Sequence, residues 1–79
     1  MPVAYVLAKI EVGQEKQVLE TIRNLRGVTS ITFTYGIYDL HVEVKFGTIE
    51  ELDEFIFDKV RKVSGIKETV TLVASYRGV

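Results

Sequence analysis

Residues 28–46 read VTSITFTYGIYDLHVEVKF, and most of the architecture follows from this stretch. Its first half is rich in β-branched and aromatic residues, which favour β-strands. Its second half alternates apolar residues with polar ones such as His41 and Glu43, the pattern of a strand with one buried face. Gly36 stands between the two halves. The sequence therefore predicts a hairpin that turns at Gly36.

The segments on either side of this hairpin each supply a strand and a helix. Upstream, residues 3–12 predict a central strand, and residues 14–26 predict an amphipathic helix that ends at Gly27. Downstream, Thr48 and Glu51 form a capping box at the start of a second helix, which continues to Gly65. Residues 66–76 alternate again and predict a last strand, with Val70 and Leu72 on the face that the helices cover.

This order of elements, βαββαβ, predicts an α+β fold, the ferredoxin-like sandwich, over residues 1–79 as a single domain. Right-handed crossovers place both helices on one face of a four-stranded antiparallel sheet. The other face is expected to be bare and too apolar for a solvated surface, so we expect a homodimer that forms through the sheet, a dimeric α+β barrel. The residues expected on that face are Val3, Tyr5, Leu7, Lys9, Asp39, His41, Glu43, Lys45, Thr71 and Val73.

The composition excludes several classes of protein. Ten Lys and Arg residues balance eleven Asp and Glu residues, so the chain lacks the basic surface that a phosphate backbone requires, and we expect no direct binding to nucleic acid. There is no cysteine, which excludes disulfides and thiolate metal sites. The apolar stretch in the N-terminal segment MPVAYVLAKIEV is too short for a signal peptide or a membrane span, because charged residues interrupt it early. We therefore expect a soluble, cytoplasmic protein without membrane contact.

Residues suited to catalysis are few. His41 is the only histidine, and the three serines have no recognisable base partner. His41 with Asp39 or Glu43 could form half of a metal site, but cross-strand pairing with Lys9 or Glu11 is the more economical interpretation. The glycines are isolated at turns and helix ends and form no phosphate-binding loop. We expect no metal and no cofactor.

The stretch YGIYDL, residues 35–40, leaves two interpretations open. A free amino acid needs an anion for its ammonium group, hydrogen-bond donors for its carboxylate and an apolar wall for its side chain. Asp39, the turn at Gly36, and Ile37 with Tyr35 offer these three. Alternatively, Asp39 only ends a turn or pairs with Lys9. The residues alone favour neither interpretation.

Several motifs together resemble one family. They are the βαββαβ order, the G-x-Y-D of YGIYDLHVEV, the helix ends RGV and SGI, and TVT at residues 69–71. In this combination the chain resembles the effector-binding domain of the Lrp/AsnC regulators, the RAM domain (regulation of amino acid metabolism). Met1 is followed directly by the first predicted strand, so we expect no helix-turn-helix. The resemblance is therefore to the stand-alone form, without a DNA-binding domain.

This resemblance implies a function and a site. Domains of this family form dimers through their sheets, the dimers commonly form rings of four, and amino acids bind between neighbouring dimers. The matching residues here are Tyr35, Gly36, Ile37, Tyr38 and Asp39 on one wall, with Thr69 and Thr71 from a neighbour. Asp39 would face the ligand ammonium. The implied function is non-enzymatic: an amino-acid-binding module that modulates transcription indirectly, for example by co-assembly with full-length Lrp/AsnC regulators.

Two alternatives share the fold. The first is a small cofactor-free enzyme of the dimeric α+β barrel type, a monooxygenase or an isomerase, with His41 and Asp39 in a cavity of one subunit or dimer. The second is a metabolic regulatory subunit resembling ACT domains, which usually accompany an enzyme. An enzyme would enclose its pocket, whereas the amino-acid sensor would bind its ligand between dimers.

Overall fold

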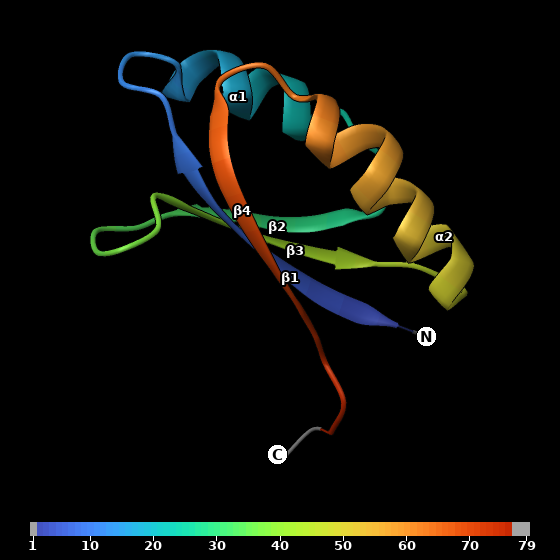
Figure 1. The fold of residues 1–79 in the computed structure, drawn as a ribbon. Coiled ribbons are helices and arrows are strands. Elements are labelled where there is room, and N and C mark those ends of the chain that lie inside the picture. Colours follow the sequence, from blue (N-terminus) through green and yellow to red (C-terminus); the bar gives the residue numbers. More distant parts are fainter. Residues whose placement is uncertain (1, 77–79) are drawn as a thin grey trace.

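The computed structural model describes residues 2–76. Its strands are β1 (Val3–Ile10), β2 (Val28–Phe33), β3 (Leu40–Lys45) and β4 (Ile66–Val73). Helix α1 (Glu15–Ile22) follows β1, and helix α2 (Ile49–Glu54) follows β3 and continues into η1 (Phe55–Lys59) and η2 (Val60–Lys62). The predicted βαββαβ order is confirmed (Figure 1). No helix within the described residues is long and apolar enough to cross a membrane.

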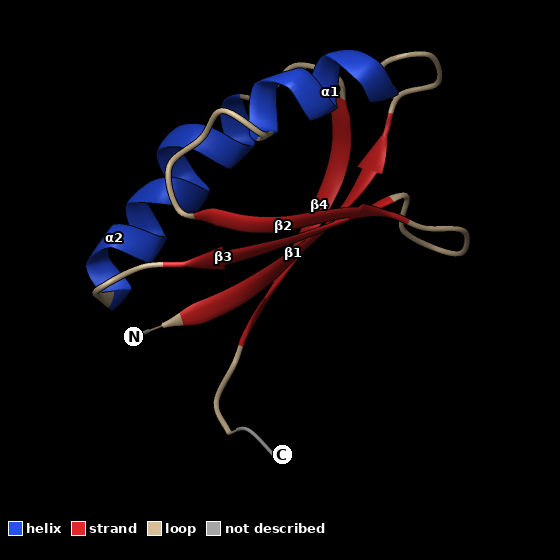
Figure 2. Cartoon of the chain, turned by 180° about the vertical axis from the view of Figure 1, so that it is seen from behind, coloured by secondary structure: helices blue, strands red, loops and turns tan. Residues whose placement is uncertain are grey.

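The four strands form one antiparallel sheet in the order β2-β3-β1-β4. Both helices lie on the same side of this sheet and leave its other side uncovered (Figures 1 and 2). The predicted ferredoxin-like arrangement is therefore confirmed. We call the uncovered side the helix-free face.

The core lies between the sheet and the helices. The even-numbered residues of β1 and β3 point into it, and Val18 and Ile22 of α1 meet them from above. From the second helical segment, Leu52, Phe55 and Val60 are buried as well. The full set of buried apolar residues is Ala4, Val6, Ala8, Ile10, Val18, Ile22, Leu40, Val42, Val44, Phe46, Leu52, Phe55, Val60 and Val63. The strand periodicity read from the sequence thus identifies the buried residues of β1 and β3 correctly, whereas no residue of β4 is in this set.

The side-chain direction predicted for β4 is wrong. In an antiparallel ladder, residues directly opposite each other point to the same face of the sheet. Thr71 lies opposite the buried Val6, and Val73 lies opposite the buried Ala4, so both point to the helix side. Leu72 instead lies opposite Tyr5, and Val70 opposite Leu7, on the helix-free face. The prediction placed Val70 and Leu72 on the helix side because of their alternation, but both faces of β4 carry apolar residues, with Ile66 and Val73 on the helix side.

The hairpin and the helix boundaries also differ in detail. The strands end at Phe33 and begin again at Leu40, so a loop of residues 34–39 replaces the expected tight turn at Gly36. Helix α1 ends near Arg23, before the predicted end at Arg26. The side-chain amide of Asn24 donates a 2.7 Å hydrogen bond to the Glu20 carbonyl, which competes with the backbone donor that would continue the helix. The last strand ends at Val73, before the predicted end at Tyr76.

Half of the predicted capping box of the second helix is confirmed: Thr48 caps the helix, whereas the reciprocal bond from the Thr48 N–H to the Glu51 carboxylate is not among the hydrogen bonds of the described residues. The Glu51 N–H donates a 3.2 Å hydrogen bond to the Thr48 hydroxyl, and this fixes the first turn of α2. The helix does not stay regular, however. Over η1 it widens into a π-helical turn, where the Val60 N–H donates to both the Phe55 and the Ile56 carbonyls, and η2 is a short 3-10 turn. Apolar spacing alone did not predict this widening.

Candidate functional site

The loop of residues 34–39 is the most exposed apolar feature at one end of the sheet. Tyr35 is fully exposed, and Ile37 is 77% exposed. Gly36 has a φ of 122°, and nothing lies within 4 Å of the position where a side chain would begin. The tip of this loop therefore makes no packing contact with the domain below it, and its large side chains are available to another molecule.

The base of the loop is closed by hydrogen bonds. The Thr34 N–H donates to the Asp39 carbonyl at 2.9 Å, and the Thr34 hydroxyl donates to the Tyr38 carbonyl at 2.8 Å. These bonds join the last residues before β3 to the first residue after β2. The exposed tip thus stands on a hydrogen-bonded base, which is a common arrangement for binding loops on a rigid scaffold.

Asp39 is bonded to β1. Its N–H donates to the Ala8 carbonyl, and its Oδ2 accepts a 2.9 Å hydrogen bond from the Ile10 N–H. The register of β1 against β4 shifts between Lys9 and Ile10, so Ile10 needs a partner where the ladder is irregular. Oδ1 takes part in no hydrogen bond or ion pair with the described residues. One carboxylate oxygen is therefore structural, and the other is available to a ligand.

Lys9 stands in β1 between Ala8 and Ile10, the two residues that bond to Asp39. Its ammonium nitrogen is 3.9 Å from the Glu68 carboxylate and 5.7 Å from the centre of the Tyr38 ring. The Lys9 and Glu68 side chains are 38% and 54% exposed, so this ion pair contributes little to stability. The pairing of Asp39 with Lys9, one of the alternatives that the sequence left open, is not among the ion pairs of the described residues; Lys9 pairs with Glu68 instead. Asp39 therefore has no ion-pair partner among the described residues.

The two threonines lie away from the loop of their own chain. Thr69 pairs with Ala8 on one side of β1, whereas Leu40, next to Asp39, pairs with Ala8 on the other side. Two strand spacings of about 4.8 Å therefore separate Thr69 from β3. Thr69 and Thr71 point to the helix side of the edge strand β4 and are half-buried. The structure thus brings residues 35–39 together but does not bring the threonines to them within one chain.

Thr69 borders an open depression of about 320 Å³ between the end of the second helical segment and β4. Its rim carries Arg61, Lys67 and Glu68. The complete lining is Val60, Arg61, Val63, Ile66, Lys67, Glu68 and Thr69. This depression lies on an edge strand, where a neighbouring molecule would have access to it.

The sequence did not reveal two further features of this end of the molecule. The loop between β1 and α1 projects at the same end as the loop of residues 34–39 (Figures 1 and 2), and Val12 in it is 95% exposed. The hydrogen bond from Ile10 to Asp39 joins residues 29 positions apart. In the sequence, Val12 next to Gly13 is a signal that could have located this loop. The hydrogen bond between Ile10 and Asp39 has no such signal, because it depends on the sheet register.

The helix-free face has an apolar centre. Tyr5, Leu7, Val70 and Leu72 adjoin one another on β1 and β4, and Tyr5 and Leu72 are 40% and 51% exposed. His41 and Glu43 of β3 lie beside them, opposite Leu7 and Tyr5. Within the described residues, no three His, Cys, Asp or Glu side chains are close enough together to hold a metal ion.

Comparison with known proteins identifies the fold and the family. The Lrp/AsnC ligand binding domain matches residues 3–77. The solved structure of FFRP-DM1 superimposes with a TM-score of 0.90 at 36% identity and covers 95% of this chain and 100% of that chain. The transcriptional regulator NMB0573 of Neisseria meningitidis, solved as a complex with L-Met, has a TM-score of 0.90. At 14% identity over 99% of this chain and 52% of that one, it shows the fold alone.

Among curated proteins, an uncharacterized HTH-type transcriptional regulator of Pyrococcus furiosus is 31% identical over 71 residues. The match covers 90% of this chain and 48% of that regulator, so the chain spans about half the length of the curated relative. The matching family is one of regulatory ligand-binding domains and not of enzymes, and the enzyme alternative is therefore dropped. The chain belongs to the Lrp/AsnC ligand-binding domain family.

Proposed function

We propose that this chain is an amino-acid-binding effector module that modulates transcription indirectly, through ligand-dependent assembly. The observation that carries the proposal is the hydrogen bonding of the Asp39 carboxylate. One oxygen accepts a hydrogen bond from the Ile10 N–H, and the other has no hydrogen-bond partner among the described residues. A carboxylate placed in this way pairs well with an ammonium group, because charge-assisted hydrogen bonds are stronger than neutral ones.

The rest of the loop supplies the other needs of an amino acid. Backbone N–H groups around Gly36 bind the ligand carboxylate, and Tyr35 and Ile37 cover its side chain. Tyr38, whose ring lies beside the Lys9 ammonium, completes this wall. Thr69 and Thr71 come from a neighbouring subunit, because in their own chain they lie across β1 from the loop. The complex of the Neisseria regulator with L-Met supports an amino acid as the class of ligand.

Assembly follows from the helix-free face. Its apolar centre, formed by Tyr5, Leu7, Val70 and Leu72, is best buried against the same face of a second copy. The resulting homodimers then associate further into a ring of four dimers, with the loops of residues 34–39 at the contacts between dimers. Ligand binding at such a contact changes the stability of the ring, since a ligand shifts an equilibrium by its differential affinity for the two states.

The effect on transcription passes through a partner. The curated relative is named as an HTH-type transcriptional regulator, and the chain matches about half of it. In our proposal, the domain of residues 1–79 acts as a stand-alone module in the cytoplasm and co-assembles with full-length Lrp/AsnC regulators. With ten basic and eleven acidic residues, it does not bind DNA directly.

A thermal-shift screen of the purified chain against the twenty standard amino acids tests this function. A ligand that binds only the folded state stabilises it by RT ln(1 + [L]/Kd), which is about 2.7 kcal/mol at a hundredfold excess over Kd. We expect at least one amino acid to raise the melting temperature and to change the sedimentation coefficient of the assembly. If all twenty leave both quantities unchanged at millimolar concentration, the proposal is wrong.

A further inference from the structure

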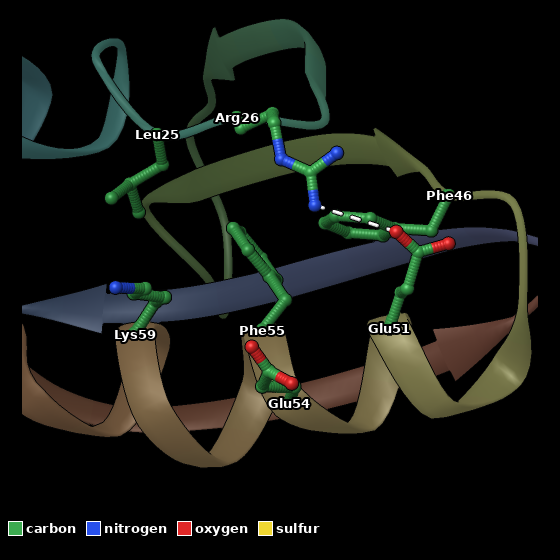
Figure 3. Close-up of a pocket in the computed structure, with 7 residues that line it drawn as sticks. All are labelled: Leu25, Arg26, Phe46, Glu51, Glu54, Phe55 and Lys59. Atoms are coloured by element: carbon green, nitrogen blue, oxygen red, sulfur yellow. Dashed lines mark hydrogen bonds and ion pairs between the residues drawn. The ribbon is translucent and has the colours of Figure 1, made fainter.

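A separate cleft opens beside α2, on the helix side of the molecule (Figure 3). Its volume is about 70 Å³. A cavity of about 150 Å³ holds a benzene molecule, so this cleft has room for an apolar group of a few carbons. We call it the α2 cleft. Its lining is Leu25, Arg26, Phe46, Glu51, Glu54, Phe55 and Lys59.

The floor of the α2 cleft is apolar and well fixed. The rings of Phe46 and Phe55 lie 5.2 Å apart, tilted by 48°, and Leu25 approaches them from the loop before β2 (Figure 3). A Cβ atom on Gly27 would lie only 2.4 Å from the Phe46 ring, so the backbone at Gly27 passes directly over this ring. The Phe46 side chain therefore has little freedom to swing into the cleft and fill it.

The rim of the cleft carries two cations and two anions. Arg26 reaches across it, with its Nη2 3.4 Å from Glu51 Oε2, while Glu54 and Lys59 stand further along the helix (Figure 3). The Arg26 side chain is 82% exposed, and its single long contact leaves further guanidinium donors available. A rim of balanced charge favours a ligand that itself carries both charges over a simple anion or cation.

The backbone next to the cleft is also unusual. The π-helical turn of η1 begins at Phe55 and ends at Lys59, and both residues line the cleft. Such turns are rare, are usually costly relative to a regular helix and occur frequently at functional sites. The turn is an observation independent of the cavity and its charges.

From these observations we propose that the α2 cleft is a second binding site, for an amino acid with a short aliphatic side chain. The ligand side chain contacts Phe46, Phe55 and Leu25, its carboxylate binds Arg26, and its ammonium group binds Glu54. This site goes beyond the function proposed above, since it shares no residue with the loop of residues 34–39.

The two sites are far apart. Strand β3 runs from Leu40, next to Asp39, to Lys45, next to Phe46. Five steps of about 3.4 Å each place Leu40 and Lys45, the two ends of this strand, roughly 17 Å apart. Loss of one site therefore leaves the other in place, and a titration can follow the two separately.

Titration with L-valine, followed by amide chemical shifts of the ¹⁵N-labelled protein, tests the proposal. We expect saturable shifts at residues 25–27, at Phe46 and along α2 and η1. Arg26→Gln should weaken this binding at least fivefold. Arg23→Gln is the matched control, because Arg23 also pairs with an exposed glutamate, Glu20, at 3.2 Å but lies outside the cleft. It should leave the binding unchanged.

Two further variants make the outcome decisive. Leu25→Trp fills the apolar floor and leaves every rim charge in place, so it should abolish the shifts around the cleft. Asp39→Asn should leave the valine-induced shifts around the cleft unchanged. If this variant alters chemical shifts only at residues 34–39, the change reports on the loop site and not on the α2 cleft. Valine shifts that avoid the cleft, equal affinities of Arg26→Gln and Arg23→Gln, or isovalerate binding as tightly as valine would each overturn the proposal.

Discussion

Replacement of Asp39 separates a structural role from a ligand-binding role, because the two carboxylate oxygens have different partners. Asp39→Asn keeps a side-chain oxygen that can accept the hydrogen bond from the Ile10 N–H but removes the charge. Asp39→Ala removes both the hydrogen-bond acceptor and the charge. We therefore expect the asparagine variant to fold and assemble as the wild type does, and the alanine variant to lose stability.

The magnitudes follow from the contacts. In Asp39→Ala, the Ile10 N–H loses its partner in a partly buried position, which costs about 1 to 3 kcal/mol of unfolding free energy. In Asp39→Asn, the lost charge-assisted bond to a ligand ammonium weakens amino acid binding by roughly 1.5 to 3 kcal/mol. Since about 1.4 kcal/mol corresponds to a factor of ten, Kd should rise at least tenfold.

Isothermal titration calorimetry with the best amino acid of the screen measures the affinity of each variant, and urea denaturation measures its stability. The asparagine variant should show weak binding and nearly normal stability. If Asp39→Asn binds the amino acid as tightly as the wild type and assembles normally, Asp39 serves only to hold β1, and the assignment of residues 35–39 to the ligand site fails.

Three other outcomes are expected. Leu72→Glu should dissociate the dimer in analytical ultracentrifugation, because it places a charge on the helix-free face. Val73→Glu, at an equally exposed residue on the helix side of the same strand, should leave the dimer intact. Identical sedimentation of the two variants would refute the assignment of the dimer to the helix-free face. Gly27→Ala should cost more unfolding free energy than Gly13→Ala, by about 1 kcal/mol or more, since both have positive φ but only Gly27 approaches Phe46. Sequence-specific footprinting on duplex DNA with the purified chain should give no protection.

The element order and the core were predictable from the sequence because each depends on local periodicity. β1 and β3 carry apolar residues at every even position from Ala4 to Ile10 and from Leu40 to Val44, and all of these residues are buried. The helix cap at Thr48 is likewise a local signal, and the Thr48 hydroxyl accepts the predicted bond from the Glu51 N–H. Patterns of this kind need no knowledge of the partners across the sheet.

The remaining features depend on contacts between distant parts of the chain. The direction of β4 is set by its register against β1, and its alternation suggested the wrong face because both faces of this edge strand carry apolar residues. The bond from Ile10 to Asp39 depends on an irregular step in that ladder. The loop could be located from Gly36, but no local pattern shows that the α2 cleft joins Leu25, Phe46 and Phe55.

The closed base of the loop has a consequence for protein engineering. Thr34 and Asp39 join the two strands and β1 through their own hydrogen bonds, while Tyr35 and Ile37 extend into solvent above them. Side chains at the tip can therefore be exchanged without a loss of fold stability, since they bury almost nothing in the free chain. A small library at these two positions, on an otherwise unchanged scaffold, would test whether the loop sets the amino acid preference of the proposed site.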